Sequence, residues 1–151
     1  MRTFLGLKKY HNTTLNLKTS ITLEEIVFRN LSIWSAISSG LGVKVYYFLQ
    51  PFLGWGKDFS KEEKKIIEYI DSNTKKHPAF QIMNKLNELD QYHSYQELLK
   101  TYCDQLNIGF FDCNQMLKEN STKIDWLFVD RVHMNGDGNN LLSNYIRETI
   151  E

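Results

Sequence analysis

Asp130 and His133 are the residues whose types and spacing could most directly do chemistry. They lie in the stretch Ile124-Asp-Trp-Leu-Phe-Val-Asp-Arg-Val-His, in which Asp130 ends an apolar run and His133 follows three residues later. A carboxylate at this spacing can orient and charge an imidazole ring, which is what a general base requires. Proteins with α/β sheets place ligands and catalytic groups at the carboxyl ends of their strands. The sequence therefore favours Asp130 and His133 as a candidate catalytic pair.

The Asp-x-x-His spacing is weak evidence by itself, because the sequence contains it twice. Asp90-Gln-Tyr-His93 is the second instance, and it lies in a polar joint expected between two amphipathic helices, where a solvated helix cap is the better interpretation. For His133 the alternative to catalysis is a structural histidine that caps the last helix. The two pairs have the same spacing, so the pair at Asp130 is favoured only because it follows an apolar run.

Other chemical signatures are incomplete. Gly40-Leu-Gly42 precedes an expected strand instead of following one, so it does not fit a dinucleotide-binding turn. No Gly-x-Ser-x-Gly nucleophile elbow is present. His77 and His93 lack partners at the spacing of metal ligands. The sequence thus indicates neither a cofactor nor a metal.

Composition predicts one cytoplasmic domain. The 151 residues, 42% of them hydrophobic, suffice for one core. Eighteen basic residues balance eighteen acidic ones, which argues against a nucleic-acid or anionic membrane surface. Cys103 and Cys113 are expected to be reduced thiols, since they share no Cys-x-x-Cys motif. No apolar segment is long enough for a membrane span or a signal peptide.

The order of the expected elements is typical of an α/β protein with a mostly parallel sheet. Residues 1–21 are expected to be irregular. Helices are expected from Thr22 to Ser39-Gly40, from Ser60, at 79–89, from Ser94, briefly at 113–119 and over the C-terminal residues to Ile150; three of them open on capping boxes, Thr22–Glu25, Ser60–Glu63 and Ser94–Glu97. Strands are expected at 43–50 and 108–112, with a doubtful extended segment at 124–129. Such sheets have about five or six strands, so part of the sheet is missing.

The aromatic residues divide into two expected groups. Trp34, Tyr46 and Tyr47 fall within the apolar helix and strand patterns, which favours positions in the core. The loop 52–56, Phe-Leu-Gly-Trp-Gly, follows Pro51 and is expected to expose its aromatic side chains.

The stretch from Phe128 to Leu142, with its Asp-x-x-His, downstream glycine and closing helix, resembles the last conserved block of SGNH/GDSL hydrolases. The segment Val43 to Pro51 is similar to the strand before a sheet-top loop in bacterial members, and the helix opening at Ser60-Lys-Glu-Glu is similar to the helix that follows there. The resemblance covers roughly residues 22–150. It makes 22–151 the C-terminal part of an SGNH hydrolase-like domain.

The resemblance implies a three-layer α/β/α flavodoxin-like fold and hydrolysis of an ester or an O-acetyl carbohydrate. In that reaction a serine attacks the acyl carbon, His133 takes the serine proton, and Asp130 holds the imidazole tautomer. The family's Gly-Asp-Ser, oxyanion glycine and Gly-x-Asn-Asp blocks are absent from this sequence. The chain is therefore expected to be a C-terminal half that is inactive alone. Its expected partner is an N-terminal half, or another protein, at the exposed sheet edge. The alternative is a non-catalytic α/β binding or interaction module.

Overall fold

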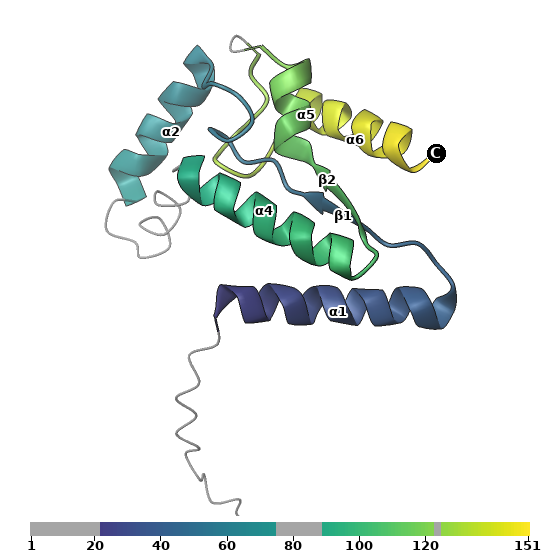
Figure 1. Cartoon of the computed structure of the whole chain (residues 1–151). Coiled ribbons are helices and arrows are strands. Elements are labelled where there is room, and N and C mark those ends of the chain that lie inside the picture. Colours follow the sequence, from purple (N-terminus) through teal and green to yellow (C-terminus); the bar gives the residue numbers. More distant parts are fainter. Residues whose placement is uncertain (1–21, 75–88, 123–124) are drawn as a thin grey trace, which may run out of the picture.

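The fold combines helices with a small parallel sheet (Figure 1). A computed structural model of the chain describes residues 22–74, 89–122 and 125–151. Within them the elements are α1 (Leu23–Leu41), β1 (Tyr46–Leu49), α2 (Lys61–Thr74), α4 (Leu89–Gln105), β2 (Gly109–Asp112), α5 (Cys113–Asn120) and α6 (Gly136–Ile150). The predicted mixed α/β class is confirmed. The predictions for 1–21, for most of 79–89 and for Ile124 lie outside the described residues.

The sheet consists of β1 and β2, which run parallel with Tyr46 opposite Gly109 and Leu49 opposite Asp112. Both strands fall inside the segments predicted for them, and both are four residues long. The doubtful extended segment before Asp130 does not join the sheet. Its Phe128 instead forms an isolated antiparallel bridge with Met134. Among the described residues, the sheet therefore has two unpaired outer edges.

Two apolar clusters form the core, and alternate residues of the strands feed each of them. Tyr47 stacks on Phe110 beside the first cluster, which buries residues of α1 and α4. Phe48 stacks on Phe111 beside the second cluster, which buries residues of α5 and is joined by side chains of α6. Successive strand residues point to opposite faces of a sheet. Each face of this sheet thus has its own apolar cluster.

Several boundary predictions need correction. The Thr22–Glu25 capping box is confirmed, but α1 continues to Leu41 and ends on Gly42, whose φ of 64° lies in the left-handed region. The third predicted capping box is wrong, because Ser94 lies inside α4 and begins no helix. The apolar face of α4 extends on both sides of Ser94, from Tyr92 to Cys103, and both residues are buried. Packing of that face overrides the local start signal.

Two predictions about aromatic residues are also wrong. Trp34 was expected in the core, yet 54% of it is exposed, and Tyr46 is exposed as well. Phe52 was expected on the surface of its loop, yet it is buried and stacks against Trp55. Hydrophobic pattern identifies elements, whereas the side of an element that faces the core depends on contacts distant in sequence.

Both cysteines are free and buried, as predicted for reduced thiols. Burial, which disfavours the thiolate, raises the pKa of Cys103 to about 11 and that of Cys113 to about 12. Thiols with such pKa values are poor nucleophiles. None of the helices in the described ranges has the length and apolar character needed to cross a membrane.

Candidate functional site

The structure brings Asp130 and His133 into direct contact. Oδ2 of Asp130 lies 2.7 Å from Nδ1 of His133. The other oxygen, Oδ1, accepts hydrogen bonds from the backbone N–H groups of Val132 at 2.8 Å and of His133 at 2.7 Å. The carboxylate therefore organises the turn with one oxygen and holds the imidazole ring with the other.

These contacts decide which nitrogen of His133 carries the proton when the ring is neutral. Partial burial acts to raise the pKa of the Asp130 carboxyl, but the hydrogen bonds from the Val132 amide and from the ring and amide of His133 hold this pKa below its usual range. An ionised carboxylate only accepts hydrogen bonds, so Nδ1 is the donor. The lone pair of a neutral His133 is then on Nε2, which is the arrangement that a general base needs.

The ring of His133 is accessible. The His133 side chain is 73% exposed, and Asp130 is 35% exposed beneath it. Among the described residues, no serine or cysteine side chain forms a hydrogen bond with His133. The alternative interpretation of His133 as the cap of the last helix is wrong, since Asn135 caps α6 and accepts from the Gly138 N–H.

The turn that carries His133 is fixed to the carboxyl end of β1. The Leu53 N–H donates to the Arg131 carbonyl at 2.9 Å, and the Gln50 side-chain amide donates to the Val132 carbonyl at 3.1 Å. Arg131 is buried, and its Nη2 donates to both carboxylate oxygens of Asp71 on α2, at 2.9 Å to Oδ1 and 2.8 Å to Oδ2. Although the run before Asp130 is not a strand of the sheet, the pair still lies where α/β proteins place reactive groups.

Glu63 anchors the segment that leads into Asp130, a role that the sequence alone did not predict. Its predicted capping box is confirmed, because Oε2 accepts from the Ser60 N–H and the Ser60 hydroxyl accepts from the Glu63 N–H. Its second oxygen, Oε1, accepts from the backbone N–H groups of Leu127 at 2.9 Å and Phe128 at 3.0 Å. Glu63 thus joins the start of α2 to the segment that leads into Asp130. The sequence identified Glu63 only as the glutamate of a capping box. No nearby residue in the sequence indicated that it also binds Leu127 and Phe128.

Lys57 completes the environment of Glu63. Its Nζ lies 2.6 Å from Oε2, and the two side chains are 2% and 0% exposed. Burial acts to raise the pKa of Glu63, but the hydrogen bonds from Lys57 and from the Ser60 and Leu127 amides hold it below its usual range. A buried carboxylate satisfied in this way is a structural group.

Replacing Gly138 by alanine should destabilise the support of the site. A Cβ at Gly138 would lie 2.6 Å from the Leu127 carbonyl oxygen and 2.8 Å from Cε of Met134. We expect Gly138→Ala to lower the free energy of unfolding by about 1–3 kcal/mol, the usual effect of overpacking, as measured by urea denaturation. The matched control is Gly136→Ala in the same helix, where a Cβ meets nothing within 4 Å. Equal stability of the two variants would contradict the close packing of α6 on this segment.

Asp112, at the carboxyl end of β2, is fully engaged in structure. Its Oδ2 accepts from the Tyr92 hydroxyl at 2.5 Å and from the Gln96 amide at 2.8 Å. Its Oδ1 accepts from the backbone N–H and the side-chain amide of Asn114, whose own oxygen accepts from the Phe52 N–H. This network joins the ends of the two strands and the start of α5, and leaves Asp112 no free role as an acid or base.

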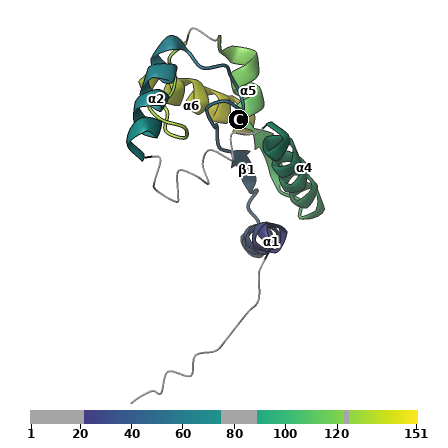
Figure 2. The same ribbon diagram turned by 90° about the vertical axis from the view of Figure 1, so that its left-hand side faces the viewer.

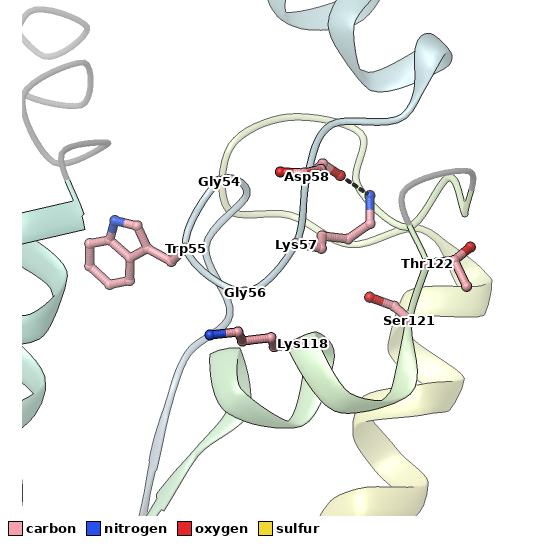
Figure 3. A pocket seen from close by; sticks show the side chains of 8 residues that line it. All are labelled: Gly54, Trp55, Gly56, Lys57, Asp58, Lys118, Ser121 and Thr122. Atoms are coloured by element: carbon pink, nitrogen blue, oxygen red, sulfur yellow. Dashed lines mark hydrogen bonds between the residues drawn. The ribbon is translucent and has the colours of Figure 1, made fainter.

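An open pocket of about 520 Å³ lies apart from the pair (Figure 3). Its lining consists of Gly54, Trp55, Gly56, Lys57, Asp58, Lys118, Ser121 and Thr122. Lys57 is held by Glu63, and the hydroxyls of Ser121 and Thr122 are hydrogen-bonded to their own turns. Neither Asp130 nor His133 lines the pocket, so its chemistry does not join that of the pair.

The second Asp-x-x-His does not form a joint between two helices, because both residues lie within α4. The ring of His93 is exposed and lies 5.0 Å from that of Tyr92, centroid to centroid. In the part of the chain that the structure describes, no three His, Cys, Asp or Glu side chains are grouped to hold a metal ion.

No protein-family model matches this sequence, and no curated protein matches it.

Proposed function

We propose that residues 22–151 are the C-terminal part of an SGNH/GDSL-type hydrolase with a three-layer α/β/α fold, in which His133 is the general base and Asp130 its positioning residue. The observation that carries the proposal is the 2.7 Å contact between Nδ1 of His133 and a carboxylate held by two backbone N–H groups. The apolar clusters on the two faces of the parallel sheet support the layered fold.

In the proposed reaction, the base is Nε2 of a neutral His133, which carries the lone pair of the ring. This nitrogen removes the proton from a serine hydroxyl as the oxygen attacks the carbonyl carbon of an ester or an O-acetyl group on a carbohydrate. The imidazolium then gives the proton to the departing alcohol, and Asp130 stabilises the cation while it exists. A second polypeptide segment must supply the serine and the oxyanion hole. The chain alone is therefore proposed to be inactive.

The test compares the chain alone with the chain joined to the translated sequence that lies upstream of its gene. p-Nitrophenyl acetate hydrolysis should be absent in the first and present in the second, and His133→Ala should abolish it. The matched control is His93→Ala, which changes the second Asp-x-x-His and should leave the rate unchanged. Hydrolysis by the chain alone that is lost on His133→Ala would overturn the need for a second segment. Upstream sequence without a Gly-Asp-Ser after an apolar strand would overturn the hydrolase half.

A second candidate function, a non-catalytic binding or interaction module, is favoured by one observation. Both outer edges of the β1–β2 sheet are unpaired in the described ranges, and such edges readily accept a strand from another protein. In this function Asp130 serves only to shape the turn through Val132 and His133. The chain joined to its translated upstream sequence distinguishes the two candidate functions. Only a hydrolase should then hydrolyse p-nitrophenyl acetate in a way that depends on His133.

A further inference from the structure

Gln50 directly follows β1 and is held through both its backbone and its side chain. Figures 1 and 2 show β1 leading away from α1 toward α2, α5 and α6, so its carboxyl end lies near these helices. The backbone carbonyl of Gln50 accepts from the side-chain amide of Asn114 at 3.2 Å, and Asn114 is fully buried. The side chain of Gln50 donates from Nε2 to the Val132 carbonyl at 3.1 Å. Gln50 therefore links the end of the sheet to the turn that carries His133.

The Val132 carbonyl belongs to the same peptide group as the His133 N–H. This N–H donates to Oδ1 of Asp130 at 2.7 Å, and Oδ2 of Asp130 lies 2.7 Å from Nδ1 of the His133 ring. Because a peptide group is planar, a donor that fixes its carbonyl oxygen also fixes the direction of its N–H. A hydrogen bond to the carbonyl polarises the peptide group and strengthens the bond that its N–H donates. A continuous series of contacts thus runs from Gln50 through one peptide group and Asp130 to the imidazole.

The preceding peptide group is held in a different way. Its N–H, that of Val132, also donates to Oδ1 of Asp130, at 2.8 Å, but its carbonyl, that of Arg131, accepts from the backbone N–H of Leu53. Among the described residues, the Gln50 side chain is the one donor to the Val132 carbonyl. Two adjacent N–H groups therefore reach the same carboxylate oxygen, and only the second belongs to a peptide group held by a side chain.

We propose that Gln50 is a positioning residue for His133, which acts through the Val132–His133 peptide group to hold the Asp130 carboxylate where it orients the imidazole. The effect on the turn is a property of the folded chain alone, whereas the effect on hydrolysis rests on the proposed function. Gln50 is exposed, so water competes for its hydrogen bond, and its contribution is that of one ordinary hydrogen bond. In the proposed hydrolase, a displaced imidazole would remove the serine proton more slowly.

Hydrogen exchange of backbone N–H groups, measured by NMR on the chain alone, tests the proposal. Gln50→Met keeps the length of the side chain and removes its donor. We expect exchange of the His133 N–H to become about 2- to 10-fold faster, the equivalent of one ordinary hydrogen bond, and exchange of the Val132 N–H to change less. Gln50→Glu, which sets an acceptor against the Val132 carbonyl, should have the same selective effect.

The matched control is Gln115→Met on α5, an exposed glutamine whose side-chain amide donates to Glu119 in the same helix. This variant should leave both N–H groups unchanged, and circular dichroism establishes that each variant is folded. Unaltered exchange of the His133 N–H in both Gln50 variants would overturn the proposal. An equal change at Val132 and His133 would overturn it too, because Gln50 would then anchor the whole turn rather than act through one peptide group.

The chain joined to its translated upstream sequence separates this inference from the proposed function. In the joined chain, Gln50→Met should lower kcat about 2- to 10-fold with little change in KM, since Gln50 acts on the base through two other groups. An active joined chain whose kcat is unchanged by Gln50→Met would overturn the positioning role. A joined chain without hydrolysis would overturn the proposed function, while the exchange rates of the chain alone would still decide whether Gln50 acts through the His133 N–H.

Discussion

Glu63→Ala is expected to lower the free energy of unfolding by about 3–5 kcal/mol, the usual cost of removing one partner of a buried ion pair. The variant leaves the Lys57 ammonium buried without its carboxylate, which lies 2.6 Å away in the native chain. The backbone N–H groups of Leu127 and Phe128 also lose their acceptor. Urea denaturation followed by circular dichroism measures the change.

The matched control for this loss is Glu62→Ala, one residue earlier in α2. Glu62 is exposed and in the first helical turn, so its replacement should cost less than about 1 kcal/mol through the helix dipole. Lys57→Met should cost less than Glu63→Ala, since the carboxylate would keep its backbone donors. If Glu63→Ala proved as mild as Glu62→Ala, the carboxylate would not be what holds α2 to the segment before Asp130.

The same carboxylate makes stability dependent on pH. The pKa of Glu63 is lower in the folded chain than its ordinary value of 4.5, and that of Asp130 is lower than 3.8. A carboxyl of this kind contributes its full stabilisation above the ordinary pKa and loses it as pH falls through the lower, native value. Acidification below about pH 4.5 should therefore destabilise the native chain, and Glu63→Gln should be less sensitive over the same range.

Local signals in the sequence predicted local structure well. Two of three capping boxes are present, because each depends on residues three apart along one helix turn. Both strands were predicted from runs of β-branched and aromatic residues. The third capping box failed at Ser94, where the buried face of α4 continues through the start signal. The exposure of Trp34 also could not be predicted, since it depends on which neighbours surround α1.

In the candidate site too, contacts between residues close in sequence could be predicted, whereas contacts between distant residues could not. The contact between Asp130 and His133 spans three residues, so its spacing could suggest it. The attachment of this turn to β1 could not be predicted, because Gln50 reaches Val132 across 82 positions in sequence. Nor could the hydrogen bond from the Leu127 N–H to Glu63, because these residues are 64 positions apart in sequence. Spacing therefore identified Asp130 and His133 as a candidate pair, and only the folded chain reveals what holds the two side chains in place.

Asp130→Asn is expected to reverse the tautomer of His133 while preserving the fold. The asparagine carbonyl oxygen can still accept from the Val132 and His133 N–H groups, as Oδ1 of Asp130 does. Its NH₂ group then faces Nδ1 of the ring and donates to it, so the proton of a neutral His133 moves to Nε2. Nitrogen NMR of the chain alone, at a pH where the ring is neutral, distinguishes protonated from unprotonated ring nitrogens. Asp90→Asn, in the second Asp-x-x-His, is the matched control and should leave the His133 signals unchanged.

In the proposed hydrolase, joined to the segment proposed to supply the serine, the same substitution should lower kcat by about 10⁴-fold, as the wrong tautomer does in a Ser-His-Asp triad. With Nε2 protonated, His133 has no lone pair to receive the serine proton, although the thermal stability should change little. A merely structural role for Asp130, in which it shapes the turn through the Val132 and His133 N–H groups, predicts that the asparagine changes the tautomer but leaves the rate of hydrolysis unaffected. Retention of the Nδ1–H tautomer in Asp130→Asn would show that a group other than this carboxylate sets the ring, and would remove the basis for assigning His133 as a base.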